Sequence, residues 1–164
     1  MVSRLRFETM ALIVVGVDGS GVSRDALRWA LDEARLRKST LRAVHAWQPY
    51  TVLPGYGQPE DFEPGELSRA AAEHLHEVIA EVAAESDGVT VEEVVIEGPP
   101  ASVLVDAAEG ADMLVVGSRG LGGFAGLLVG SVSQQCAQHA PCPVLIFRSS
   151  AAPEPVALRS PQGY

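Results

Sequence analysis

The chain has little that would tie it to a membrane, to nucleic acid or to a disulfide framework. It contains only two cysteines, Cys136 and Cys142, without Cys-x-x-Cys spacing, a pattern that favours small buried thiols in a reducing compartment. No apolar run approaches the ~20 residues of a membrane span, and the first ten residues are too polar for a signal peptide. Twelve lysines and arginines stand against 21 aspartates and glutamates, a net charge of -9, which argues against a general surface for nucleic acid or anionic lipid. We therefore expect a cytoplasmic protein that binds neither nucleic acid nor membrane and holds any anionic ligand locally.

Apolar runs alternate with segments of helical periodicity along the chain. The runs are continuous rather than alternating, as in a parallel sheet that helices cover on both faces. Strands are expected at 11–17, 40–47, 89–96, 111–116 and 144–147, and helices at 23–38, 66–85, 100–109 and 131–139. This strict alternation predicts a doubly wound α/β domain with a parallel sheet. The domain is expected to span 11–148, with an N-terminal extension at 1–10, a long loop at 48–65 and a flexible tail at 149–164.

Glycine is concentrated in one stretch, 115–133, which reads VVGSRGLGGFAGLLVGSVS. Its six glycines lie between an expected strand and an expected helix start. Ordered glycine costs backbone entropy and adds nothing to a core, so this density indicates either positive φ angles or a close approach of another group to the backbone. The free amides of the helix that starts at Ser131 would face the loop with the positive end of the helix dipole. The stretch therefore predicts an anion site, in the first place for a phosphate chain.

Other ligand-binding patterns fit less well. Residues 120–125 satisfy G-x-G-x-x-A, but a dinucleotide fingerprint opens a helix at once and places an acidic residue about 20 positions on, and 137–148 contain no acid. No G-x4-G-K-[ST] occurs, so the lysine of rapid ATP hydrolysis is missing. His74 and His76 point apart on a helix and no His-Glu-x-x-His occurs, so we expect no metal site built by the protein.

The glycine spacing G-x2-G-x9-G-S over 117–131, together with VVGVDGS at 14–20, resembles the nucleotide-binding branch of the universal stress protein family. The resemblance covers about residues 10–148. It implies a Rossmann-like fold of the adenine nucleotide alpha hydrolase type, with parallel strands in the order 3-2-1-4-5. It further implies ATP, or AMP or ADP, as the ligand and a stress-linked regulatory role. A Mg²⁺ or Mn²⁺ ion could accompany the phosphates.

In that strand order the sheet reverses between the first and fourth strands, which end at Asp18 and Gly117. Ligands of doubly wound sheets bind at this reversal. Asp18 could be a turn or helix-capping residue, but beside the glycine loop it is expected to accept hydrogen bonds from the ribose hydroxyls. By the resemblance, backbone groups of Val44 and its neighbours are expected at the edge of adenine.

The amides around the loop glycines are expected on the phosphates, and Arg119 either reaches a phosphate or is solvated. The full set of residues expected at ATP is Val17, Asp18, Gly19, Ser20, Val44, Gly117, Ser118, Arg119, Gly120, Gly122, Gly130, Ser131, Val132 and Ser133.

No residue is marked by the sequence as an activated nucleophile or catalytic base. We therefore expect a nucleotide-binding module with at most weak ATPase or autophosphorylation activity. The alternative is an enzyme that slowly hydrolyses ATP or transfers a phosphoryl group, with Asp18, Ser131 or Ser133 as candidates. A dimer that binds no nucleotide is a third hypothesis, which the intact glycines oppose. The apolar strand Val144–Phe147 would form a sheet edge, and the resemblance implies a homodimer through it.

Overall fold

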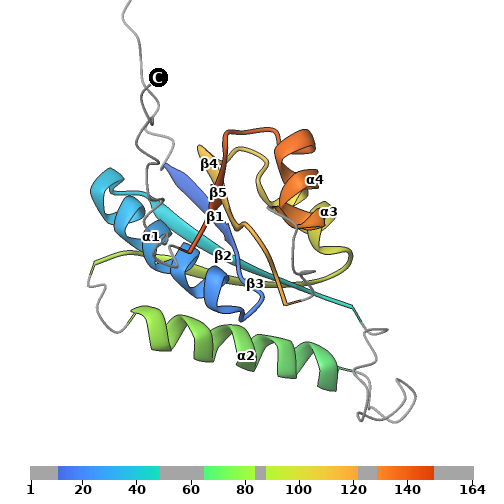
Figure 1. Ribbon diagram of the computed structural model, residues 1–164. Coiled ribbons are helices and arrows are strands. Elements are labelled where there is room, and N and C mark those ends of the chain that lie inside the picture. Colours follow the sequence, from blue (N-terminus) through green and yellow to red (C-terminus); the bar gives the residue numbers. More distant parts are fainter. Residues whose placement is uncertain (1–10, 49–64, 84–87, 122–128, 150–164) are drawn as a thin grey trace, which may run out of the picture.

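The computed structural model describes residues 11–48, 65–83, 88–121 and 129–149. In these residues strands and helices alternate without exception (Figure 1). The elements are β1 (Leu12–Gly16), α1 (Gly21–Arg37), β2 (Thr40–Trp47), α2 (Glu66–Ala83), β3 (Val91–Glu97), α3 (Pro100–Ala107), β4 (Met113–Gly117), α4 (Ser131–His139) and β5 (Val144–Phe147). The sheet order is β3-β2-β1-β4-β5 and every neighbouring pair is parallel. The predicted doubly wound fold and its strand order are confirmed.

The predicted element boundaries hold closely. β2, α4 and β5 begin and end at the predicted residues, and α1 starts at Gly21 rather than at residue 23. The earlier start has a local cause, because the Ser20 side chain caps the helix by accepting a hydrogen bond from the Ser23 amide at 3.2 Å. The predicted N-terminal extension, most of the 48–65 loop and nearly all of the 149–164 tail lie outside the described residues.

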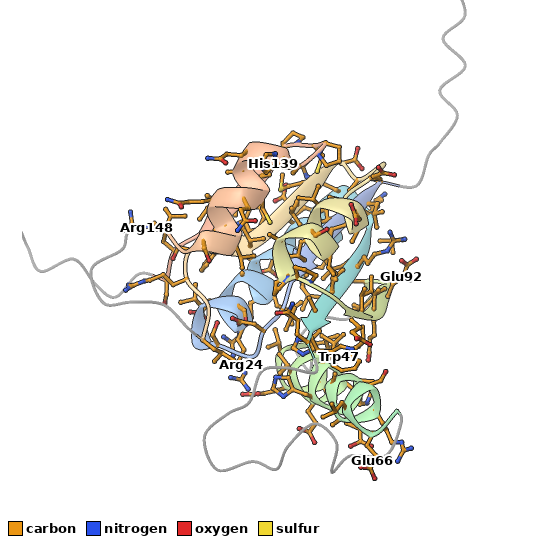
Figure 2. The ribbon with its side chains drawn as sticks, turned by 90° about the vertical axis from the view of Figure 1, so that its right-hand side faces the viewer. Arg24, Trp47, Glu66, Glu92, His139 and Arg148 are labelled. Carbon is orange, nitrogen blue, oxygen red and sulfur yellow. The ribbon has the colours of Figure 1, made fainter. Side chains whose placement is uncertain are left out.

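Helices cover both faces of the sheet and bury a core on each. α1 and α2 pack on one face, and α3 and α4 on the other (Figure 1). Side chains of β1 alternate between the two cores: Ile13 and Val15 face α1 and α2, and Val14 faces α3 and α4, each with 0% exposure. Charged side chains such as Glu66, Glu92 and Arg148 project from the outer surface (Figure 2). The central strands β1 and β4 are therefore held by packing from both sides.

Both cysteines are free. Cys136 is fully buried, and burial raises the pKa of its thiol to about 11. The thiol therefore stays protonated at neutral pH and packs as a small apolar residue. Burial also raises the pKa of the half-buried Cys142. Both thiols are thus poor nucleophiles, in keeping with the structural role predicted for them.

Within the described ranges, none of the helices has both the length and the apolar composition that a bilayer crossing requires.

Candidate functional site

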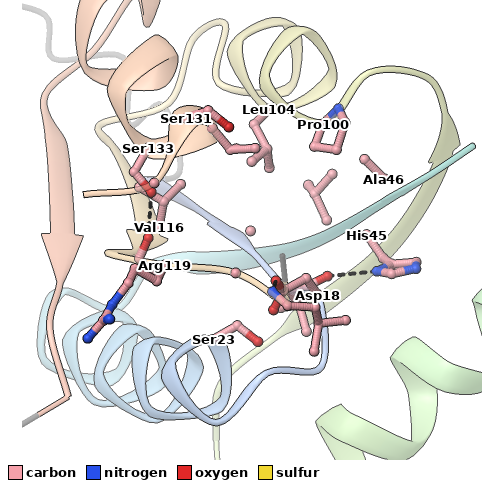
Figure 3. Close-up of a pocket in the computed structure, with 18 residues that line it drawn as sticks. Asp18, Ser23, His45, Ala46, Pro100, Leu104, Val116, Arg119, Ser131 and Ser133 are labelled. Atoms are coloured by element: carbon pink, nitrogen blue, oxygen red, sulfur yellow. Dashed lines mark hydrogen bonds between the residues drawn. The ribbon is translucent and has the colours of Figure 1, made fainter. Parts of the chain in front are cut away.

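A cavity of about 610 Å³ opens at the carboxyl ends of β1 and β4 (Figure 3). This is the point at which the strand order reverses, as predicted. The volume falls in the range of roughly 300 to 1,000 Å³ that is usual for small-molecule sites. The lining residues are Gly16, Val17, Asp18, Ser23, Val44, His45, Ala46, Pro100, Leu104, Val116, Gly117, Arg119, Gly120, Leu121, Gly130, Ser131, Val132 and Ser133. The two motifs, although far apart in the sequence, thus meet at one cavity.

Most of the predicted site residues line this cavity, but three described ones do not. Gly19, Ser20 and Ser118 are absent from the lining, and Gly122 lies outside the described residues. Gly19 adopts a φ of 82° in the turn after β1, a conformation that glycine adopts without strain. Ser20 is the N-cap of α1. Ser118 is buried, and its amide donates to the Phe147 carbonyl at 2.7 Å. These three residues therefore hold the turn after β1, the start of α1 and the end of β4 in place, and they do not line the cavity.

The Asp18 carboxylate spans the mouth of the cavity. Its Oδ1 accepts a hydrogen bond from the Ser20 amide at 2.9 Å, and its Oδ2 accepts one from the Leu121 amide at 3.0 Å. Burial tends to raise the pKa of this carboxyl, but hydrogen bonds with Ser20, Ser23 and Leu121 outweigh burial and hold the pKa below its ordinary value. Asp18 is therefore ionised at neutral pH. Asp18 is thus a turn residue that also bonds to the start of the glycine loop, and its expected contact with ribose hydroxyls stays a prediction.

The close approach of another group to the backbone, rather than a positive φ, explains why position 120 is a glycine. Gly117, Gly120 and Gly130 have no positive φ. A Cβ on Gly120 would lie 2.6 Å from Asp18 Oδ2, whereas a Cβ on Gly130 would meet the Ser118 carbonyl oxygen at 3.5 Å, an ordinary contact. A side chain at position 120 would therefore displace the Asp18 carboxylate. At position 130 the free protein tolerates a side chain.

Helix α4 points free amides toward the cavity. Its first helical hydrogen bond runs from the Gln134 amide to the Gly130 carbonyl at 3.0 Å, so the amides of residues 131–133 precede it, and no side chain caps this end. The Ser133 hydroxyl fixes the helix to β4 by donating to the Gly117 carbonyl at 2.5 Å. An uncapped helix N-terminus of this kind is suited to an anion.

The prediction that the Gly130 amide is free for a phosphate is wrong. This amide donates to the Ser118 carbonyl at 2.7 Å, and the bond closes the loop at the base of α4. Three amides rather than four are therefore available at this end of the helix. Gly130 itself still lines the cavity through the rest of its backbone.

Exposed backbone groups are expected at Val44 and its neighbours, but Val44 itself does not offer them, because its carbonyl accepts a hydrogen bond from the Val17 amide at 2.9 Å. The backbone N–H and C=O groups of even-numbered residues of β2 point toward β1, as the bond from the Thr40 amide to the Ala11 carbonyl shows. Those of odd-numbered residues point toward β3. The pairing of β1 with β2 ends at Val44, whereas β2 continues to Trp47. Ala46 therefore directs its N–H and C=O past the end of β1, on the side of the cavity that it lines. The free backbone groups of β2 on this side therefore belong to Ala46, two residues beyond Val44.

The remaining lining residues that the sequence does not identify are mostly apolar. Pro100 and Leu104 come from α3, and Leu104 packs so close to β1 that a Cβ on Gly16 would lie 2.9 Å from its Cδ1. His45 has a structural role, because its Nδ1 lies 2.7 Å from the Val17 carbonyl oxygen and must carry the proton. The residue also lines the cavity, which the sequence did not indicate.

Positive charge is sparse around the cavity. Arg119 is the only arginine or lysine among its described lining residues. The side chain is exposed and points away from Asp18 and Ser131 (Figure 3). The guanidinium is thus exposed to solvent, and its expected contact with a phosphate stays a prediction. Backbone amides, rather than cationic side chains, are thus the nearest donors for an anion.

We expect Asp18→Asn to destabilise the fold at neutral pH and to matter less in acid. The pKa of this carboxyl is lower in the folded protein than its ordinary value of 3.8. The ionised form therefore stabilises the fold above the unfolded-chain pKa, and this contribution is lost as the pH falls through the lower folded-state pKa. Urea denaturation at pH 7 and at about pH 3 should show the gap between wild type and variant shrinking in acid.

A matched control is Asp106→Asn, an exposed carboxylate on α3, for which we expect little change at either pH. An equal gap for Asp18→Asn at both pH values would contradict the assignment of an ionised, hydrogen-bonded Asp18.

Residues 10–148 match the model of the Universal stress protein family. The chain is 41% identical over 142 residues to a universal stress protein of Mycobacterium tuberculosis (strain H37Rv), an alignment that covers 85% of this chain and 46% of that protein. This chain thus spans about half the length of the curated relatives that it matches.

Two solved structures show the same fold with a nucleotide bound. One is a universal stress protein in complex with cAMP, with a TM-score of 0.63 and 30% identity, covering 86% of this chain and 98% of that chain. The other is a universal stress protein family protein of Arabidopsis thaliana with AMP bound, with a TM-score of 0.58 and 27% identity, covering 90% of this chain and 97% of that chain.

Proposed function

The chain belongs to the universal stress protein family, and we propose that it binds an adenine nucleotide in the cavity at the ends of β1 and β4. The observation that carries this proposal is the ionised Asp18 carboxylate facing a bare helix N-terminus across one cavity. A nucleotide needs both groups, since its sugar offers hydroxyl donors and its phosphate is an anion. The bound AMP and cAMP of the two similar structures support the same ligand class.

The base, the ribose and the first phosphate would each meet cavity residues of suitable chemistry. The base would lie among the apolar side chains of Val44, Leu104 and Val116, with its polar edge on the free N–H and C=O of Ala46. Asp18 would accept from the ribose hydroxyls through lone pairs that Ser20 and Leu121 leave unused. The amides of residues 131–133 would hold the first phosphate.

ATP, ADP and AMP share this adenosine and first phosphate, and we propose ATP as the ligand that also uses the glycine loop. Added phosphates would extend toward Gly120 and Arg119, which line the cavity beyond α4. A Mg²⁺ or Mn²⁺ ion would be held by the phosphate oxygens. The protein offers it little else, because no three His, Cys, Asp or Glu side chains lie together within the described parts of the chain.

Nucleotide occupancy, rather than turnover, is the proposed function. Ser133, one of the candidate nucleophiles, is buried and donates its hydroxyl proton to the Gly117 carbonyl. Asp18, the only carboxylate among the described lining residues, already accepts two backbone hydrogen bonds. The hydroxyl of Ser133 is therefore already committed, and the lowered pKa of Asp18 makes its carboxylate a weak base. A regulatory module that responds to the nucleotide fits these contacts better than an ATPase does.

We expect ATP hydrolysis far below the ~1 to 100 per second of kinases. The cavity supplies positioning by backbone amides but neither a lysine nor an uncommitted base. Steady-state phosphate release measures this rate. Turnover within the kinase range that disappears in Asp18→Asn would identify an enzyme in place of a sensor.

Gly120→Val should weaken nucleotide binding. The added side chain would displace the Asp18 carboxylate, whose Oδ2 lies 2.6 Å from the position of the new Cβ. Loss of one charge-assisted hydrogen bond is worth about 1.5 to 3 kcal/mol, or roughly a tenfold to hundredfold rise in Kd. Titration calorimetry with AMP and with ATP measures the change.

Gly21→Val is the matched control, because a Cβ at Gly21 meets nothing within 4 Å. We expect its affinity to equal that of the parent. If Gly120→Val is folded by circular dichroism and binds with parental affinity, the Asp18 carboxylate does not hold the nucleotide.

We further propose a homodimer through β5. This strand is an edge of the sheet, and its odd-numbered residues bond to β4, as the pair from the Ser118 amide to the Phe147 carbonyl shows. Val144 and Ile146 therefore direct their backbone groups outward. A half-buried apolar edge of this kind favours pairing with a second copy by a twofold axis.

Light scattering should report a dimer at micromolar concentration. Ile146→Pro removes an outward amide without breaking the bonds to β4, so it should shift the folded protein toward monomer. A parental chain that is monomeric under these conditions would contradict the proposal.

A further inference from the structure

Helix α2 contacts the turn that holds Asp18, although no described residue of α2 lines the cavity. His74 covers Gly19 so closely that no Cβ could stand there, and its ring meets that of His45 edge-on with centroids 5.6 Å apart. Two helical turns further on, Glu81 reaches Arg24 of α1, with Oε2 3.2 Å from Nε. Arg24 lies at the junction of α1 and α2 (Figure 2).

Arg24 in turn holds the Asp18 turn. Its Nη1 donates a hydrogen bond to the Gly19 carbonyl at 2.6 Å. Its Nε is buried and makes no hydrogen bond among the described residues, so the contact with Glu81 is an ion pair by distance alone. The guanidinium is thus fixed between the turn and α2, and its strongest directional contact is the one to Gly19.

That contact bears directly on the Asp18 carboxylate through a single peptide group. The Gly19 carbonyl and the Ser20 amide belong to the same planar trans peptide and point in opposite directions. Arg24 holds the carbonyl end, and the amide end donates to Asp18 Oδ1 at 2.9 Å. Rotation of this peptide would break both bonds together. Gly19, with a φ of 82° and no side chain, has little of its own to resist such a rotation.

We propose that Arg24 is a positioning residue of the nucleotide site, which orients the Asp18 carboxylate by fixing the Gly19–Ser20 peptide and couples that carboxylate to α2 through Glu81. This inference rests on the proposed nucleotide binding for its consequence in affinity. The positioning itself belongs to the free protein. The carboxylate that would hold the ribose is thus linked, through Arg24 of α1, to a helix α2 of which no described residue lines the cavity.

The first test is made without nucleotide, by solvent exchange of backbone amides in the ¹⁵N-labelled protein. Arg24→Met keeps most of the apolar stem and removes the guanidinium. We expect the Ser20 and Leu121 amides, which both donate to Asp18, to exchange several-fold faster in this variant. The control is Arg28→Met, one helical turn along α1, whose guanidinium pairs with Asp25. In the control both amides should exchange at the parental rate.

The second test is the affinity for AMP by calorimetry. Arg24→Met should weaken binding about tenfold, at a melting temperature close to that of Arg28→Met, and Glu81→Gln should show a smaller loss. Arg24→Lys should recover part of the affinity, because an ammonium can reach the Gly19 carbonyl but lacks the planar fork of arginine. If Arg24→Met does not fold, Glu81→Gln and Arg24→Lys decide the matter by the same two measurements.

Parental exchange rates at Ser20 and Leu121 in all these variants would overturn the proposal. Faster exchange confined to the Arg24 and Glu81 variants would support it, even if the parent bound no AMP. Absence of AMP binding in the parent would instead overturn the proposed function alone.

Discussion

The parallel pairing of β1 with β4 is the constraint on which the rest of the site depends. Val15 lies opposite Val115 in this register, so the two strands end side by side although about a hundred residues separate them. The first turn after β1 carries a carboxylate, and the first turn after β4 carries a glycine loop. Because both strands are buried in cores on both faces, their ends cannot drift apart without loss of packing. The cavity is therefore a property of the sheet, and the loops only furnish its chemistry.

Several polar groups at the ends of β1 and β4 are hydrogen-bonded to one another. Asp18 links its own turn to the glycine loop, and Ser133 and Gly130 link α4 to the end of β4. These bonds use some of the groups that a ligand would otherwise have, such as the Gly130 and Leu121 amides, and they leave the amides at the first turn of α4 free. They also hold the cavity open in the free protein, so that a ligand meets donors and acceptors already in place.

Local periodicity suffices to predict the alternating strands and helices and the doubly wound α/β class. The strand order, and with it the meeting of the two motifs, follows from the resemblance to the universal stress protein family. The sequence does not suffice to place the free backbone groups of β2 at the cavity. The free backbone falls at Ala46 rather than Val44 because β2 outlasts its pairing with β1, and strand register is not encoded in local composition. The walls from α3 are missed for another reason, since an apolar residue such as Leu104 has the same pattern whether it faces the core or a ligand. The occupied Gly130 amide is a tertiary bond to Ser118, which spacing alone cannot show.

The account's central claim is that the cavity between Asp18 and α4 holds an adenine nucleotide. The most direct measurement is mass spectrometry of small molecules released by denaturing the purified protein, with Gly120→Val prepared in parallel. The account predicts an adenine nucleotide released from the parent, approaching one per chain, and strongly depleted from the folded variant. Equal release from both proteins, or a different class of compound at that stoichiometry, would contradict it.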